Sequence, residues 1–228
     1  MTQFEYLRPR SGSRLLRLSD VGRIADSLKR GAVAVLPTET GYMLAALATS
    51  PAAVERAFAV KGRNAAAVVH VACASLGMAQ AAGKLNRRAL RLLGEFTPGP
   101  VTVIVDKTPL LPDRLVTLGG TVGIRIPDYP ATLQVIGEVG APLTATSLNR
   151  SGSQAGPAGK SDLQVLDWPA ADVVCVLEDD ESIVHPLPST LVRVTGDAVE
   201  ILRPGPIPEA EIHRVAGLAG YLEAADTP

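Results

Sequence analysis

Polar side chains interrupt several apolar runs of this 228-residue chain, and most of them are basic or carry a hydroxyl group. The segment PTETG (residues 37–41) places two threonines and a glutamate between two apolar runs, where a turn alone would need only glycine, proline or asparagine. The other interruptions are Lys61, Arg63, His70, Arg125, Ser147, Asn149, Ser189 and Arg203. Each falls at the end of a predicted strand or the start of a loop, where ligand sites of open α/β sheets collect.

This set of side chains favours an anionic, phosphate-bearing ligand. Arginine forms bidentate contacts with phosphate or carboxylate, lysine adds a compact point charge, and hydroxyl groups supply further hydrogen bonds. Carboxylates are too few for paired-carboxylate catalysis, and the sequence has neither GxGxxG nor GxxxxGK(S/T). No histidine or cysteine has zinc-binding spacing, so we predict no metal-ligating residues. Taken singly, Lys61 and Arg63 would also fit the cationic end of a helix, and His70 a strand residue facing water.

The composition is that of a chain that buries a large core without disulfides. Hydrophobic residues make up 46% and aromatic residues only 4%, so the core must consist of alanine, valine, leucine and isoleucine. Cys73 and Cys175 lie in apolar runs, which predicts buried thiols in a reducing compartment. A net charge of −1 argues against a dedicated nucleic-acid binder. The sequence has no signal-peptide pattern and no run of 18 apolar residues, so we expect a cytoplasmic protein without a membrane partner.

Helical and strand patterns mix without strict alternation. Ser19 is the expected N-cap of a helix that ends before Gly31, and Ser50-Pro51 starts the next one. Further helices are expected at 86–96, 131–138 and 208–224, and strands at 32–36, 42–48, 68–72, 101–105, 122–126, 143–146, 172–177, 190–195 and 199–202. We therefore expect an α/β (α+β) protein with a mixed sheet flanked by helices, a domain over residues 15–207 and a helical tail over 208–228.

Seven motifs occur along the chain in the order of a known family. They are PTETGYMLAA, KGRN followed by VVHV, FTPGPVTVIV, VGIRIPDYP, PLTATSLNRSG, PSTLVRV and ILRPGPI. In this order they resemble the YrdC-like family of L-threonylcarbamoyladenylate synthases, from about residue 19 to residue 207.

The resemblance implies a twisted sheet of parallel and antiparallel strands around a large concave basic cavity. It implies a nucleotidyltransferase that forms threonylcarbamoyl-AMP and pyrophosphate from L-threonine, bicarbonate and ATP, with Mg²⁺ assisting the leaving pyrophosphate. Such chemistry needs positioning and charge neutralisation more than a proton-transfer pair. A separate transferase would use the product to make threonylcarbamoyladenosine in tRNA.

The resemblance also implies roles for individual residues. Lys61 and Arg63 would face the triphosphate and act in catalysis. Threonine would be bound by Thr40, Tyr42, His70, Arg125 and Ser189, with Arg125 holding its carboxylate. The nucleotide would contact Lys61, Arg63, Thr121, Ser147, Asn149 and Arg203.

Two alternatives remain open from the sequence. The run Gly41-Tyr42-Met43-Leu44-Ala45 lacks two glycines of the family pattern, residues 64–69 form a shortened segment, and Leu148 stands where the family has alanine. These departures, and a Gly-Tyr pair typical of YciO-like proteins, fit a divergent paralogue that binds a nucleotide or another anion without this activity. The second alternative is a module that binds double-stranded RNA or tRNA, although aromatic residues for base stacking are scarce.

Overall fold

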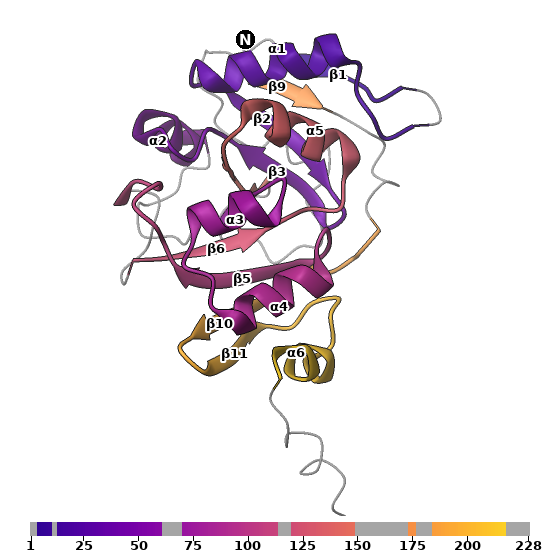
Figure 1. Cartoon of the computed structure of the whole chain (residues 1–228). Coiled ribbons are helices and arrows are strands. Elements are labelled where there is room, and N and C mark those ends of the chain that lie inside the picture. Colours follow the sequence, from indigo (N-terminus) through magenta and orange to yellow (C-terminus); the bar gives the residue numbers. More distant parts are fainter. Residues whose placement is uncertain are drawn as a thin grey trace, which may run out of the picture.

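A computed structural model of the chain describes residues 4–10, 13–60, 70–113, 120–148, 173–176 and 184–217. Two mixed sheets form its framework (Figure 1). In the first sheet the strands run in the order β1 (Phe4–Leu7), β9 (Val173–Val176), β2 (Val33–Thr38), β3 (Gly41–Ala45) and β8 (Thr146–Ser147). In the second the order is β11 (Ala198–Arg203), β10 (Thr190–Thr195), β5 (Val101–Asp106), β6 (Thr121–Arg125), β4 (His70–Ala72) and β7 (Leu143–Thr144).

Helices cover both faces of the first sheet. Helices α1 (Leu18–Lys29) and α5 (Pro130–Val139) pack on one face, in a core cluster that includes Ile24, Leu36 and Val135. Helix α2 (Pro51–Val60) packs on the other face through Ala53 and Ala57. The alternation of side chains along a strand explains how β2 and β3 supply apolar residues to both clusters.

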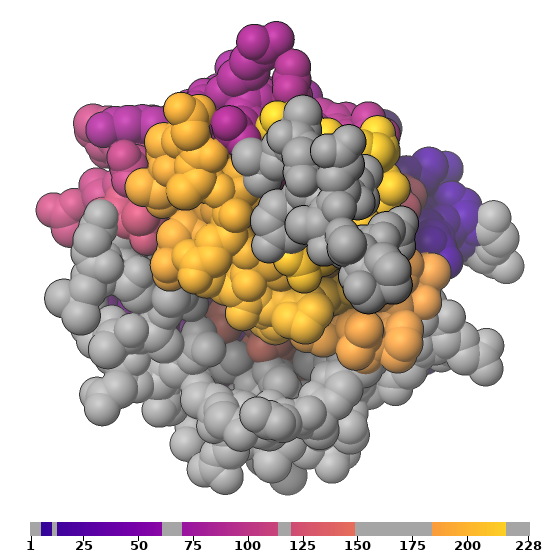
Figure 2. Space-filling model, turned by 90° about the horizontal axis from the view of Figure 1, so that it is seen from below, coloured from indigo at the N-terminus to yellow at the C-terminus, as the bar shows by residue number. Residues whose placement is uncertain are grey.

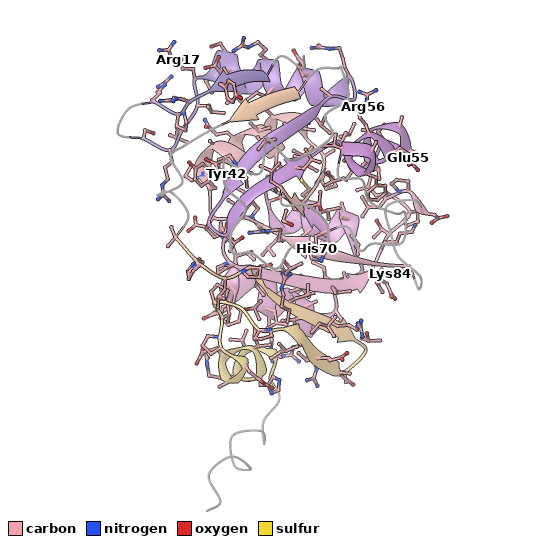
Figure 3. All side chains as sticks on the ribbon, turned by 180° about the vertical axis from the view of Figure 1, so that it is seen from behind. Arg17, Tyr42, Glu55, Arg56, His70 and Lys84 are labelled. Carbon is pink, nitrogen blue, oxygen red and sulfur yellow. The ribbon has the colours of Figure 1, made fainter. Side chains whose placement is uncertain are left out.

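Strands β4 and β7 of the second sheet contribute Ala72 and Leu143 to the cluster with α1 and α5. Further helices pack on the second sheet through its own core cluster. These are α3 (Leu76–Ala82), α4 (Arg87–Phe96) and α6 (Glu209–Ala216), and Figure 1 shows α3 and α4 in front of β5 and β6. In β5, Val101, Val103 and Val105 face these helices, so Thr102 lies on the opposite face. Figure 3 views the molecule from behind, with His70 labelled in the region of this opposite face.

Most predicted elements are present, with shifted ends. The strand expected at 32–36 continues through Thr38, and only Glu39 and Thr40 separate it from β3. The predicted cap at Ser19 is wrong: α1 begins at Leu18 and its N-cap is Arg17, without a side-chain cap hydrogen bond. Residues 149–172, which follow β8 along the chain, lie outside the described residues.

The C-terminal helix differs from its prediction. It ends at Ala216, followed by Gly217 in a left-handed conformation with φ of 74°, whereas the pattern predicted helix to residue 224. Ile212 and Ala216 are buried in the same cluster as β5 and β6, so α6 is part of the core of the domain. Residues 218–228 lie outside the described part of the chain.

Two elements and the division into two sheets were not predicted. Helix α3 is capped by the side chain of Ser75, which accepts a hydrogen bond from the backbone N–H of Met78. Strand β1 pairs with β9 at an edge. An isolated bridge between Leu47 and Leu143 joins the two sheets. Within the described residues, no helix is both long and apolar enough to span a membrane.

Candidate active site

The PTETG segment forms the tight turn between β2 and β3. Thr38 pairs with Gly41, which has a φ of 114°, a conformation that favours glycine. The hydroxyl of Thr38 donates to the carbonyl of Gly41 at 2.6 Å and accepts from the backbone N–H of Thr40 at 3.3 Å. These bonds hold the turn from inside, so the side chains of Glu39 and Thr40 are presented in a defined direction.

Arg125, at the end of β6, meets this turn. Its Nη2 donates to Oε1 of Glu39 at 2.6 Å and to the hydroxyl of Thr40 at 3.1 Å. Arg125 is only 8% exposed and Glu39 only 2%, so this ion pair is buried. The Nε of Arg125 is also buried and has no hydrogen-bond partner among the described residues. An unpaired buried donor is unfavourable, and a ligand oxygen would satisfy it.

Glu39 connects three segments of the chain at this point. Its Oε2 accepts from the backbone N–H of Asp128 at 3.0 Å, directly after β6. Its backbone carbonyl accepts from the N–H of His185 at 3.0 Å, in the segment that leads to β10. These two hydrogen bonds attach the turn to the segment after β6 and to the segment before β10. The spacing of these residues in the sequence does not indicate this attachment.

A second polar group surrounds Ser189, just before β10. The hydroxyl groups of Ser189 and Thr102 are 2.7 Å apart. Arg203, on β11, donates from Nη2 to the carbonyl of Ser189 at 2.9 Å and to its hydroxyl at 3.3 Å. Burial, and then the positive charge of Arg125, lower the pKa of the Arg203 guanidinium. The two positive charges repel one another, and a nearby anion offsets this repulsion.

Strand pairing brings these groups onto one face of the second sheet. His70 pairs with Gly123, which precedes Arg125 by two residues on β6, and Thr102 lies on the neighbouring strand β5. Because alternate residues of a strand share a face, His70, Gly123, Arg125 and Thr102 lie on the face opposite α3 and α4. A Cβ atom at Gly123 would be 2.5 Å from Cδ2 of His70, so the imidazole lies against the backbone of β6.

The remaining predicted residues do not all join this group. Thr121 is at the other end of β6, four residues from Arg125, or roughly 13 Å along a strand. Ser147 is exposed on β8, opposite Met43. Tyr42 is 1% exposed and packs in the apolar cluster under α2, and Figure 3 labels it well away from His70. Lys61, Arg63 and Asn149 lie outside the described residues, so their positions remain predictions.

Three residues of the site were not among the predicted ones. Glu39 is part of the PTETG segment. A carboxylate among mostly basic candidate residues could have indicated an ion pair with one of the arginines. Thr102 is the single polar residue in the run Val101–Val105. Gly123 has no such signal, since only the imidazole of His70 on the neighbouring strand explains the missing side chain.

A hollow with several basic residues lies next to β10, α4 and the end of α6. It has a volume of about 490 Å³ and is lined by Asn86, Arg87, Arg88, Arg91, Gly196, Asp197, Ala216 and Gly217. Figure 2 shows the end of the molecule where β10, β11 and α6 are exposed, in orange and yellow. None of the predicted residues in the described part of the chain is among the lining residues, nor are Glu39 and Thr102 of the group around Arg125. The described residues contain no group of three or more His, Cys, Asp or Glu side chains that could hold a metal ion.

Comparison with known proteins places the chain in a family. The model of the Sua5, YciO and YrdC proteins, described as telomere recombination, matches residues 26–205. The chain therefore belongs to the Sua5/YciO/YrdC family, and the resemblance drawn from the seven motifs is confirmed. The expected fold class is confirmed as well, since both the mixed sheets and their flanking helices have counterparts in solved members.

Individual relatives are similar over most of this chain. Threonylcarbamoyl-AMP synthase of Bacillus subtilis is 34% identical over 203 residues, which cover 86% of this chain and 56% of the relative. The crystal structure of Pyrococcus abyssi Sua5 complexed with L-threonine matches with a TM-score of 0.82 at 27% identity, over 95% of this chain and 61% of that chain. E. coli YciO matches with a TM-score of 0.77 at 23% identity, over 91% of this chain and 98% of that chain, which supports the fold alone. The chain thus spans about half the length of the B. subtilis relative.

Proposed function

We propose that this chain forms threonylcarbamoyl-AMP and pyrophosphate from L-threonine, bicarbonate and ATP. The amine of threonine captures CO₂ as a carbamate, a carbamate oxygen attacks the α-phosphorus of ATP, and pyrophosphate leaves. The adenylate then passes to a transferase that modifies tRNA. Similarity to a B. subtilis threonylcarbamoyl-AMP synthase and to P. abyssi Sua5 crystallised with L-threonine supports the proposal.

The observation that carries the proposal is the buried Arg125 and the half-buried Arg203, with Glu39 as the carboxylate hydrogen-bonded to Arg125 among the described residues. Two guanidinium groups and one carboxylate leave one net positive charge, which suits the carboxylate of an amino acid. Arg125 would hold this carboxylate, and Ser189 and His70 would contact the rest of the threonine. Arg203 would lie toward the nucleotide.

The nucleotide and its triphosphate would be bound by two groups of residues, the first at positions 61 and 63 and the second at positions 121, 147 and 149. In this proposal Lys61 and Arg63 neutralise the phosphates during displacement, and Thr121, Ser147 and Asn149 contact the nucleotide. In this proposal a Mg²⁺ ion arrives with the phosphates of ATP and keeps most of its ligands from them and from water. When bound, this ion would stabilise the charge of the leaving pyrophosphate.

Departures from the family pattern raised the alternative of a divergent paralogue. Two of the departing residues are buried in the hydrophobic core: Met43 packs in the cluster with α1 and α5, and Leu148 packs in the cluster with α2. Neither is part of the hydrogen-bonded group around Arg125, so they give no reason to expect a blocked site. The synthase is therefore the better supported function, and the paralogue remains its alternative.

Pyrophosphate release tests the proposal. Purified protein is incubated with ATP, Mg²⁺ and bicarbonate, with and without L-threonine, and threonylcarbamoyl-AMP is identified by mass spectrometry. We expect threonine-dependent release that is lost in Arg63→Ala and retained in Arg193→Ala, since Arg193 forms only an exposed ion pair with Glu200.

Folded protein that releases no pyrophosphate would overturn the synthase proposal. A shift in melting temperature with ATP or another anion, but not with L-threonine, would then favour the paralogue. Binding of double-stranded RNA that falls steeply with salt and ignores ATP would favour the RNA-binding module.

A further inference from the structure

We infer that Glu39 is a positioning residue for the carboxylate of the amino-acid substrate, acting through Arg125. The inference rests on the proposed L-threonine site and adds to it a residue that makes no substrate contact itself. Its evidence is the geometry of one guanidinium group and the three groups to which Glu39 is bound.

Glu39 and Thr40 occupy one nitrogen of the guanidinium. Nη2 of Arg125 has two hydrogens, and it has two acceptors, Oε1 of Glu39 at 2.6 Å and the hydroxyl of Thr40 at 3.1 Å. Two bonds to one nitrogen fix the plane of the group, so the direction of the Nε–H bond is fixed as well. That nitrogen is the buried one that has no partner among the described residues. The unused donor is thus held in place before any ligand arrives.

Glu39 is itself held in place by three hydrogen bonds. Both carboxylate oxygens and the backbone carbonyl are used, by Arg125, by the N–H of Asp128 and by the N–H of His185. Glu39 is also 2% exposed, so water does not compete for these bonds. An arginine held this firmly loses little conformational freedom when it binds a carboxylate, which raises affinity and selectivity.

Charge explains why a carboxylate is needed at this position. Arg203 is close enough to Arg125 for each charge to oppose the other, and Glu39 is the group paired with Arg125 in the described part of the chain. Without Glu39, Arg125 would be buried without its counter-charge, near the half-buried and like-charged Arg203, and it would turn toward other acceptors or water. With Glu39, one net positive charge remains for the ligand.

The test compares L-threonine with L-threoninamide, which has the same shape but no carboxylate. Binding of each to the full chain is measured by calorimetry, well below the melting temperature of every variant. We expect wild-type protein to prefer L-threonine by roughly tenfold or more, as for a charge-assisted hydrogen bond. Glu39→Gln replaces the charged hydrogen bond to Arg125 by a weaker neutral one, and its amide N–H₂ cannot accept from the N–H of Asp128, so Arg125 is held less firmly and this preference should fall to less than about threefold.

Glu211→Gln is the matched control. It removes a Glu–Arg pair of the same 2.6 Å length, but on the exposed surface of α6, and should leave the preference unchanged. Glu39→Asp retains the negative charge on a shorter side chain, so we expect it to show an intermediate preference for L-threonine over L-threoninamide. If Glu39→Gln does not fold, the same comparison is made with Glu39→Asp.

The outcomes separate the inference from the proposed function. Wild-type protein that binds neither ligand overturns the threonine site and this inference with it. Wild-type protein that prefers L-threonine, together with a folded Glu39→Gln that shows the same preference, overturns the inference alone. A purely structural role for Glu39 would weaken both ligands equally, and that result would also overturn it.

Discussion

The imidazole of His70 lies directly against the backbone of Gly123 on the neighbouring strand. A Cβ atom at Gly123 would be 2.5 Å from Cδ2 of His70 and 3.1 Å from Cγ2 of Thr102. Gly123→Ala should therefore push His70 away from the sheet, lower the free energy of unfolding by about 1–3 kcal/mol and weaken L-threonine binding. Urea denaturation and calorimetry measure the two effects.

The control for this substitution is Gly22→Ala. Gly22 is in helix α1, and a Cβ atom there would have no neighbouring atom within 4 Å, so alanine should stabilise the protein by about 0.5–1 kcal/mol. Equal effects of the two substitutions would show that His70 adapts without cost.

The hydroxyl of Thr102 is expected to orient Ser189. Thr102 is fully buried and its oxygen is 2.7 Å from that of Ser189. Thr102→Val should lower the free energy of unfolding by about 1 kcal/mol and raise the KM for L-threonine, because Ser189 loses a hydrogen-bond partner. Thr102→Ser keeps the hydroxyl and should retain the wild-type KM; a raised KM in that variant alone would contradict this role.

Arg125 is expected to act through its planar geometry as well as its charge. Arg125→Lys keeps the positive charge, but its three donors lie on one nitrogen and cannot reproduce the Nη2 bonds to Glu39 and Thr40 together with a separate Nε–H donor, so L-threonine affinity should fall by roughly tenfold or more. Arg193→Lys, at the exposed pair with Glu200, should leave affinity unchanged. Calorimetry with L-threonine measures both variants, and an unaffected Arg125→Lys would show that charge alone suffices.

Cys73 should make the protein less stable at alkaline pH. Burial raises the pKa of its thiol from the ordinary value of 9.0 to about 12. Between these values the unfolded chain loses the proton and the folded chain keeps it, so the ratio of folded to unfolded protein falls by up to about tenfold per pH unit from this group. Below pH 9 the group has no such effect.

Urea denaturation at pH 8, 9 and 10 measures this dependence. Wild-type protein should lose stability above pH 9 more steeply than Cys73→Ala, in which the other titrating groups are unchanged. Parallel curves for the two proteins would mean that the thiol ionises equally in both states.

Local patterns in the sequence predicted most of the elements that carry the site. The short apolar run at 101–105 predicts β5, and the amphipathic pattern over 86–96 predicts α4. In the structure the side chain of Asn86 caps α4 by accepting a hydrogen bond from the backbone N–H of Ala89. The ends of α1 and α6 were less predictable. Ser19 is a good cap by type, but the packing of Leu16 and Val21 favours an N-cap two residues earlier, at Arg17.

The sequence by itself determined the chemistry of the site, because residue types and their order are local properties. A basic set rich in hydroxyl groups, arranged in seven ordered motifs, was enough to indicate an anionic ligand and the family. Only the tertiary structure decided which of these residues meet. Glu39 and Arg125 are 86 residues apart, and Thr102 and Ser189 are 87 apart. Strand pairing across two sheets brings them together, and pairing between distant strands depends on the packing of the whole chain.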